Sequence, residues 1–391
     1  MKGNKLKIAI QNSAWQILPM LSTLLLSLLI AKWFSLAIWG NIVSILVIQQ
    51  IVNGVLAWGN KDYLQRELGT NPSTFPSSFS QLFLERFVLY IVVVSSIFFL
   101  GLIDREYFIS FSLIVFVRFV NQSFDIFIIR DRKFLLTFFL DVLVLIIQIA
   151  WIFLINRNDV VSLNDLLVIF WLPLVIKCVL LAFIFRHSIQ TIRFEKLLLG
   201  KAFFFGMLTI TGLIHSKIDV FLVSTLVNPE TLGKYQIIMS FLWCIQSVSM
   251  FVSGPFVHNF YRMDEIAQTN SSKLLKTIGF IIVPICITLV MALLYFFYAI
   301  EINLSIVLSS LFFSIASFIY LPWIFQINKR KAEHRVLIIN IAGILILAGF
   351  LLGAHRLLGL TLEITLWIVA VHQILLTFLV FMANKKTTYA A

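Results

Sequence analysis

Twelve stretches, each long and apolar enough to cross a lipid bilayer as a helix, follow one another along the 391 residues. A spanning helix needs about 20 mostly apolar residues, because hydrocarbon offers no partner for an unpaired backbone N–H or C=O. The predicted spans cover residues 8–31, 36–59, 82–103, 107–129, 134–155, 165–185, 202–226, 232–256, 277–299, 303–326, 336–354 and 363–383. Only 12% of the residues are charged, about half the usual share in soluble domains. The sequence therefore predicts an all-α, polytopic membrane protein.

The basic residues are distributed unevenly between alternate links. If the amino terminus is cytoplasmic, 21 of the 30 Lys and Arg lie in cytoplasmic segments and four lie in outer segments. This bias predicts that both termini are cytoplasmic. The net charge of +12 is thus a topology signal, and because no basic run is interleaved with aromatic residues, we expect no nucleic-acid partner.

The links leave little room for catalytic chemistry. The longest, residues 60–81 and 257–276, are cytoplasmic, and the outer links are shorter than about ten residues. No Gly-rich phosphate loop, His-Glu-x-x-His or nucleophile elbow occurs. Cys178, Cys244 and Cys286 lie in apolar stretches and read as buried small hydrophobes. We expect a non-enzymatic transporter without catalytic residues, cofactor or metal.

The two halves of the chain contain similar hairpins. "LLIAKWFSLAIWGNIVSIL" around Gly40 aligns with "FLVSTLVNPETLGKYQIIM" around Gly233, at an offset of 193 residues. Repeated bundles are common in transporters. We expect two pseudosymmetric six-helix bundles, over residues 1–185 and 202–391, joined by a cytoplasmic linker over 186–201 and enclosing a central cavity.

Three segments carry a resemblance to a known family. "NSAWQILPMLSTLLLSLLIAKWFSLAIWGNI", "GVLAWGNKDYLQREL" and "HSKIDVFLVSTLVNPETLGKYQI" are similar to stretches of bacterial O-antigen (Wzx-type) flippases of the multidrug/oligosaccharidyl-lipid/polysaccharide exporter superfamily. The resemblance implies two bundles around a cavity that moves undecaprenyl-diphosphate-linked oligosaccharide from the cytoplasmic to the periplasmic leaflet. It also implies a location in the bacterial inner membrane, contact with membrane lipids, and work beside a polysaccharide polymerase and a chain-length regulator.

The fourth span carries the most informative polar residues. Arg118, Asn121, Gln122 and Asp125 fall at i, i+3, i+4 and i+7, which places them on one helical face. Ionisable groups in a bilayer usually face protein or a wet cavity. Two interpretations stay open. Either Arg118 and Asp125 have a structural role and pair with each other or with a neighbouring helix, or the face is a polar cavity wall in which Arg118 contacts a diphosphate or sugar acid.

The seventh span carries His215, Lys217 and Asp219. Lys217 is a candidate cavity residue because a charged patch lies near this position in the resembling flippases. The alternatives are a buried Lys217–Asp219 pair or a Lys217 side chain that extends to the interface. His215 and Asp219 are candidates for ion coupling, although a lone helical His is more often simply hydrogen-bonded.

Neutral polar residues line up on three further spans, and Gln16, Asn53 and Gln236 represent them. They either hold helices together or offer donors and acceptors to sugar hydroxyls, and we place these three in the cavity. Arg86, one turn from the cytoplasmic end of its span, either extends to the anionic lipid surface or makes a first contact with the diphosphate.

Two more carboxylates complete the ion-coupling candidates. Asp125 and Asp141 lie within spans, where a proton or sodium carrier is expected, and Lys177 has no partner that the sequence identifies. The predicted mechanism is alternating access. The alternative functions are a multidrug or cation exporter of the same superfamily and an integral-membrane polymerase or glycosyltransferase.

Overall fold

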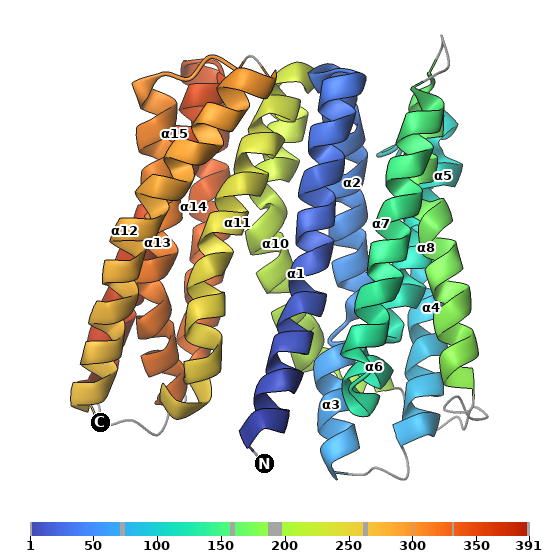
Figure 1. Ribbon diagram of the computed structural model, residues 1–391, viewed down its shortest axis with the longest axis horizontal. Helices are drawn as coiled ribbons and strands as arrows, with labels where there is room; N and C mark the ends of the chain where they lie inside the picture. The colour runs from blue at the N-terminus through green and yellow to red at the C-terminus, as the bar shows by residue number, and fades with distance from the viewer. Residues whose placement is uncertain are drawn as a thin grey trace. The chain divides into compact units, whose positions relative to one another are not determined.

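The structure is a computed structural model that describes residues 2–70, 75–156, 161–186, 198–260, 265–298, 300–330 and 332–388, and in these residues all regular secondary structure is helical (Figure 1). The helices are α1 (Lys2–Trp33), α2 (Leu36–Ala57), α3 (Asn60–Thr70), α4 (Phe75–Phe99), α5 (Arg105–Ser123), α6 (Asp125–Asp131), α7 (Phe134–Ile155), α8 (Leu163–Phe185), α9 (Leu198–Lys201), α10 (Phe203–Leu226), α11 (Pro229–Phe260), α12 (Glu265–Tyr298), α13 (Leu304–Lys329), α14 (Glu333–Leu357) and α15 (Leu362–Thr388).

The all-α, polytopic prediction is confirmed. Within the described residues, eleven helical segments are long and apolar enough to cross a membrane, and α11 covers the remaining predicted span. Several helices are longer than their spans: α4 begins at Phe75 rather than residue 82, and α12 begins at Glu265 rather than residue 277. The added turns of α12 are mostly polar, whereas those of α4 also carry the buried Phe75 and Phe79. A helix continues beyond the hydrocarbon wherever its backbone pairs internally.

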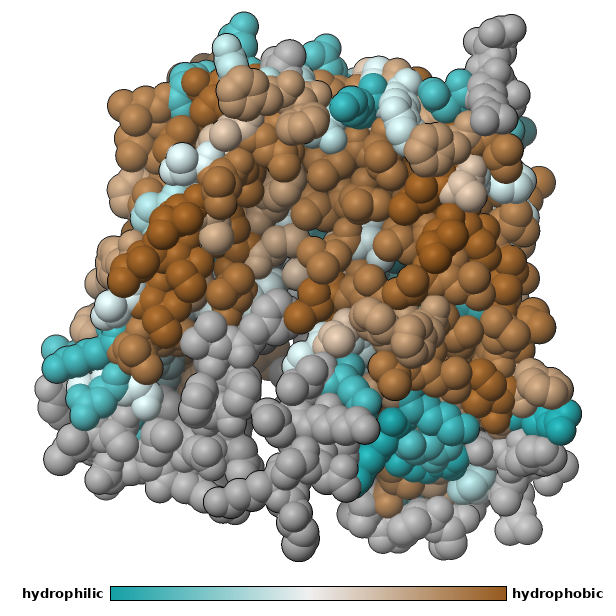
Figure 2. Space-filling model, viewed as in Figure 1, coloured by the Kyte–Doolittle hydropathy of each residue, from teal (hydrophilic) through white to brown (hydrophobic). Residues whose placement is uncertain are grey.

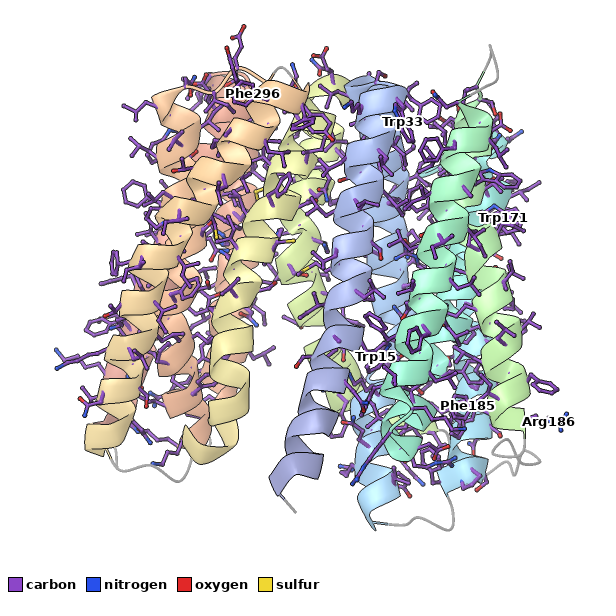
Figure 3. The ribbon with its side chains drawn as sticks, in the orientation of Figure 1. Trp15, Trp33, Trp171, Phe185, Arg186 and Phe296 are labelled. Atoms are coloured by element: carbon purple, nitrogen blue, oxygen red, sulfur yellow. The ribbon has the colours of Figure 1, made fainter. Side chains whose placement is uncertain are left out.

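The chain forms two compact units, and the first contains Met1–Leu29 and Ser44–Lys217. In it α8 packs against both α5 and α7, and α9 packs against α4. Figure 2 shows hydrophobic surface over the middle of this unit's helices and hydrophilic side chains gathered at the end that carries α6. Trp171 lies along α8, and Phe185 and Arg186 lie at that helix's end (Figure 3).

Two helix breaks in this unit are absent from the sequence prediction. One lies near the end of the predicted span 36–59 and the other within the predicted span 107–129. The helix α2, which covers most of the predicted span 36–59, ends at Ala57, and α3 follows after only Trp58 and Gly59. The fourth predicted span divides at Phe124, whose N–H bonds to the Asn121 carbonyl at 3.1 Å. Both breaks adjoin the polar site described below.

The second unit contains Ile30–Val43 and Ile218–Ala391. Its central helix is α13, which packs against α11, α12 and α15. The helix buries a row of small polar side chains, and small side chains allow close helix approach. The row consists of Ser309, Ser310, Ser314 and Ser317.

The hairpins that align in sequence also meet in this unit. A Cβ added at Gly40 would overlap the Pro229 carbonyl oxygen, and one added at Gly233 would overlap the Leu36 carbonyl oxygen. Gly233 follows Gly40 by 193 residues, and Pro229 follows Leu36 by the same number. In each hairpin, therefore, the glycine packs against the backbone of the residue that lies four positions before the glycine of the other hairpin. This reciprocity is typical of a two-fold contact.

The division of the chain at residues 185 and 201 stays a prediction, as does the central cavity. Most of the predicted linker, residues 187–197, lies outside the described residues. Residues 30–43 group with the second unit, and residues 198–217 group with the first.

Candidate functional site

The break between α2 and α3 depends on two residues with positive φ. Trp58 has φ of 38° and Gly59 has φ of 66°, a left-handed conformation that ends helices and is favoured by glycine. The Trp58 indole N–H donates to the Leu199 carbonyl at 3.0 Å. A Cβ at Gly59 would overlap Phe205 and the backbone of Gly206, so the break is packed tightly against the start of α10.

Arg86 is held at this break. Its Nε donates to the Leu56 carbonyl at 2.5 Å and its Nη1 to the Ser123 hydroxyl at 3.2 Å, while its guanidinium lies 4.9 Å from the Phe119 ring centre. The carbonyls in the last turn of a helix lack intrahelical donors, so Leu56 is a natural acceptor. Arg86 is only 1% exposed. The interpretation that Arg86 extends to the lipid surface is therefore wrong.

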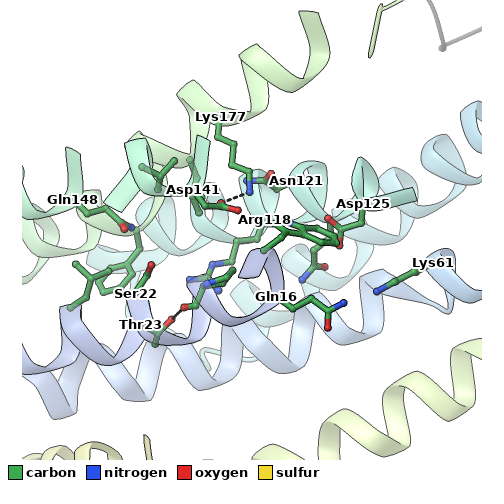
Figure 4. Close-up of a pocket in the computed structure, with 17 residues that line it drawn as sticks. Gln16, Ser22, Thr23, Lys61, Arg118, Asn121, Asp125, Asp141, Gln148 and Lys177 are labelled. Carbon is green, nitrogen blue, oxygen red and sulfur yellow. Dashed lines mark hydrogen bonds and ion pairs between the residues drawn. The ribbon is translucent and has the colours of Figure 1, made fainter. Parts of the chain in front are cut away.

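The polar face of α5 and α6 lines a pocket of about 480 Å³ (Figure 4). Arg118, Asn121, Gln122 and Asp125 all contribute to this wall. No ion pair joins Arg118 to Asp125 in the part of the chain that the structure describes. The Nε of Arg118 is buried and has no hydrogen-bond partner there. Of the two interpretations of this face, the geometry favours a polar wall.

The pocket lining also contains an ion pair, which lies beside Arg118 and Asn121 (Figure 4). The Lys177 ammonium lies 2.5 Å from a carboxylate oxygen of Asp141, joining α8 to α7. Gln148 donates to the Ile169 carbonyl at 3.1 Å between the same two helices. Asp141 is thus a member of a charge pair whose partner lies 36 residues away in sequence.

The remaining lining of this pocket comes mainly from α1 and α3. Gln16, Ser22 and Thr23 come from α1, and Lys61 from α3. In Figure 4, Lys61 and Asp125 lie toward one end of the pocket and Gln148 toward the other.

A second pocket, of about 340 Å³, lies at the α2–α3 break. It shares Lys61, Arg118, Gln122 and Asp125 with the first pocket, so the two adjoin. Its other polar lining is Arg86, Thr209 and a set of neutral amides. These amides are Gln49, Gln50, Asn53 and Asn60.

Several predicted site residues lie outside these two pockets. Lys217 and His215 line neither pocket. Asp219 accepts a hydrogen bond from the Tyr235 hydroxyl at 2.8 Å, in the second unit. Gln236 of that unit donates to Ser240 at 3.4 Å. Their predicted roles in binding and ion coupling stay predictions.

Two cations of the site were not among the residues that the sequence assigned to the cavity. Lys61 is one of the basic residues of the predicted cytoplasmic links, and the sequence identifies no partner for Lys177. A sequence signal exists for Lys61, since Trp58-Gly59-Asn60 is rich in helix-ending residues. The Lys177–Asp141 pair depends on tertiary packing and has no local signal.

No protein-family model matches the chain, and no curated protein matches its sequence. Solved structures do match its fold. An outward-facing multidrug resistance MATE family transporter of the MOP superfamily has a TM-score of 0.65 at 12% identity, covering 98% of this chain and 95% of that one. An inward-facing one has a TM-score of 0.63 at 11% identity, covering 95% and 94%.

A third similar structure is a MOP superfamily transporter from Pyrococcus furiosus Vc1 (DSM3638), for which reverse polarity of the binding pocket suggests a different function. Its TM-score is 0.63 at 13% identity, with 97% of this chain and 94% of that one covered. The matches extend over nearly the full length of every chain compared. The chain therefore has the fold of the MATE-like transporters of the MOP superfamily.

Proposed function

We propose that the protein is a flippase that moves an undecaprenyl-diphosphate-linked oligosaccharide from the cytoplasmic to the periplasmic leaflet by alternating access. The observation that carries this proposal is the pair of adjoining polar pockets, in which Lys61, Arg86 and Arg118 outnumber Asp125, a carboxylate in no ion pair with another described residue. These groups lie among helices whose outer surfaces are apolar.

An anionic headgroup explains why a membrane protein gathers cations in these pockets. A diphosphate is costly to dehydrate unless cationic donors replace its water. The amide and hydroxyl groups beside the cations match the donors and acceptors of sugars. The lipid tail needs no site of this kind, because it stays in the bilayer.

The same balance of charge argues against a cationic substrate. A multidrug or cation exporter is the main alternative, and like charges in a confined pocket would repel such a ligand. The reverse pocket polarity of the Pyrococcus furiosus transporter supports the view that this fold serves ligands of different charge.

We include alternating access because MATE family transporters with this fold have been solved in outward- and inward-facing conformations. We place the protein in the bacterial inner membrane with both termini cytoplasmic. A polysaccharide polymerase and a chain-length regulator would then use its product. Asp125, Asp141 and Asp219 remain the candidate carriers for a driving ion.

The test replaces Arg118 by Ala in cells and measures surface polysaccharide, lipid-linked precursor and protein level together. We expect at least ten-fold less polysaccharide, accumulated precursor and normal expression, with partial recovery in Arg118→Lys. Lys201→Gln is the matched control, because Lys201 is exposed in the same unit and lines neither pocket. Full export by Arg118→Ala at normal expression would refute the proposed role of the pocket.

Lys217→Ala gives a separate comparison. Lys217 was predicted from the resemblance and lies outside both pockets, so we expect a smaller loss of export than in Arg118→Ala. An equal or larger loss would show that the pockets of the first unit are not the main route.

A further inference from the structure

We propose that the α2–α3 break is a binding site for one phosphoryl group, and that the adjoining pocket along α1, α7 and α8 receives the uncharged polar part of the same ligand. The inference rests on the proposed function only for the identity of the natural ligand. The chemistry of the site follows from its side chains, which all belong to the first unit.

The first evidence is that Arg86 has one guanidinium nitrogen, Nη2, that makes no hydrogen bond within the described residues. A guanidinium carries five N–H donors in a fixed plane, and the contacts to Leu56 and Ser123 use its Nε and Nη1. Its Nη2 is buried, lies on a residue that lines the pocket, and has no partner among the described residues. The two fixed contacts orient this third nitrogen, so Arg86 is preorganised for an acceptor that enters the pocket.

The second evidence is a group of neutral amides without partners. Asn53 is 3% exposed, and neither its Nδ2 nor its Oδ1 is hydrogen-bonded within the described residues. The Gln49 Oε1 and the Asn60 Oδ1 are also buried and have no hydrogen-bond partner within the described residues. Buried polar atoms are nearly always paired in folded proteins. The Asn53 Nδ2 is therefore a donor for a phosphoryl oxygen, whereas the three amide oxygens accept and would pair with hydroxyl donors beside the phosphoryl group.

The third evidence is the helix end at the pocket. The eleven-residue α3 begins at Asn60, and Gly59, Asn60 and Lys61 all line the cavity. The first N–H groups of a helix have no intrahelical acceptor, and the helix dipole makes this end attractive to anions.

The number of donors favours a phosphoryl group over a carboxylate. Lys61, Arg86 and Arg118 approach from α3, α4 and α5, and among the side chains that the structure describes Asp125 is the one acidic residue in the lining. Three cations and a helix end offer more donors than two carboxylate oxygens can accept, whereas a phosphoryl group presents three oxygens.

The adjoining pocket has a different character. Its additional charges, on Lys177 and Asp141, neutralise each other at 2.5 Å. Apart from Lys61, Arg118 and Asp125, which the two pockets share, the rest of its polar lining, such as Ser22, Thr23 and Gln148, is neutral. The cavity therefore changes from an anion-binding end at the α2–α3 break to a neutral, hydroxyl-matching end between α1, α7 and α8.

The experiment measures ligand-induced thermal stabilisation of the purified full-length protein in detergent. Sodium diphosphate is titrated at constant ionic strength, with sodium sulfate and sodium glucuronate as comparison anions. We expect diphosphate to stabilise the protein most. Its half-saturating concentration should rise about ten-fold in Lys61→Gln and in Arg118→Gln, and stay unchanged in the control Lys201→Gln.

Asn53→Leu separates a binding role from a structural one. Replacing a buried, unpartnered amide with an apolar side chain of similar size should raise the melting temperature without ligand and reduce the diphosphate-induced shift. Functional sites show this exchange of stability for binding. Arg86→Gln is less informative, because Arg86 also holds the Leu56 carbonyl.

Undecaprenyl diphosphate and undecaprenol in mixed micelles then identify the source of the phosphoryl group. Stabilisation by undecaprenyl diphosphate but not undecaprenol, weakened in Lys61→Gln, supports both the site and the flippase. Stabilisation by inorganic diphosphate alone supports the site and refutes the flippase. The site itself is refuted if the pocket variants bind diphosphate like wild type, or if glucuronate binds more tightly.

Discussion

The reciprocal contact between the two hairpins makes a sharp prediction about Gly40. A methyl group at this position would occupy the space of the Pro229 carbonyl oxygen and come within contact distance of two more backbone atoms. Because the obstacle is backbone rather than a flexible side chain, the hairpins must move apart. Gly40→Ala should therefore destabilise the protein, although alanine is the better helix former.

The expected magnitude combines two opposing effects. Gly→Ala in a helix gains roughly 0.5–1 kcal/mol when the added methyl group meets no obstacle. Overpacking typically costs about 1–3 kcal/mol, and a backbone obstacle places Gly40 at the upper end. The net loss should be about 2 kcal/mol. Gly212→Ala is the matched control, because a Cβ there meets nothing within 4 Å and should stabilise the protein by about 0.5–1 kcal/mol.

The symmetry of the contact adds a second requirement. Gly233→Ala should cost about as much as Gly40→Ala, since it meets the Leu36 carbonyl in the corresponding way. Once one methyl group has separated the hairpins, the second enters space already opened. The double variant should therefore lose about 1–2 kcal/mol less than the sum of the single losses.

Unfolding by sodium dodecyl sulfate in dodecyl maltoside micelles, followed by circular dichroism, measures these free energies at equilibrium. If Gly40→Ala stabilises the protein as Gly212→Ala does, the backbone contact is not present. If the two single losses add without coupling, the glycines do not belong to one shared contact.

Two further predictions use the same unfolding assay. Lys177→Met leaves the buried Asp141 carboxylate without its partner and should cost about 3 kcal/mol, whereas Lys177→Met with Asp141→Leu should recover most of this loss; equal stability of the single and wild-type proteins would contradict the pair. Glu85→Ala removes the carboxylate that accepts the N–H groups of Leu198 and Leu199 at 3.1 and 2.8 Å. It should cost about 1 kcal/mol and speed amide hydrogen exchange at these two residues, and unchanged exchange there would exclude this capping role.

The spans could be predicted from sequence because the thickness of the bilayer sets both the length of the apolar stretch and the length of the helix that crosses it. The predicted span 134–155 coincides with α7. The helix breaks could not be predicted in this way. An apolar stretch contains no signal for a residue such as Trp58, whose φ of 38° is imposed by its packing and by the bond to Leu199.

The site was predictable where one helix determines it. Arg118, Asn121, Gln122 and Asp125 share a wall because their spacing follows the helical period, and the break at Phe124 does not disrupt that pattern. The environment of Arg86 was not predictable. Its acceptor is a carbonyl in the last turn of α2, at a break that no hydropathy pattern marks.

The two halves of the chain share a backbone pattern but not a charge pattern. The 193-residue offset relates both hairpins and both glycine contacts, yet the last three spans carry Asp, Glu, Lys and Arg only near their ends. The first unit, in contrast, buries Arg86 and the Lys177–Asp141 pair. Charge within a membrane span is costly, so the buried cations of the first unit argue for a ligand that requires them. Binding of the proposed anionic ligand should therefore depend on the first unit, and substitutions in the last three spans should alter it less than Lys61→Gln or Arg118→Gln.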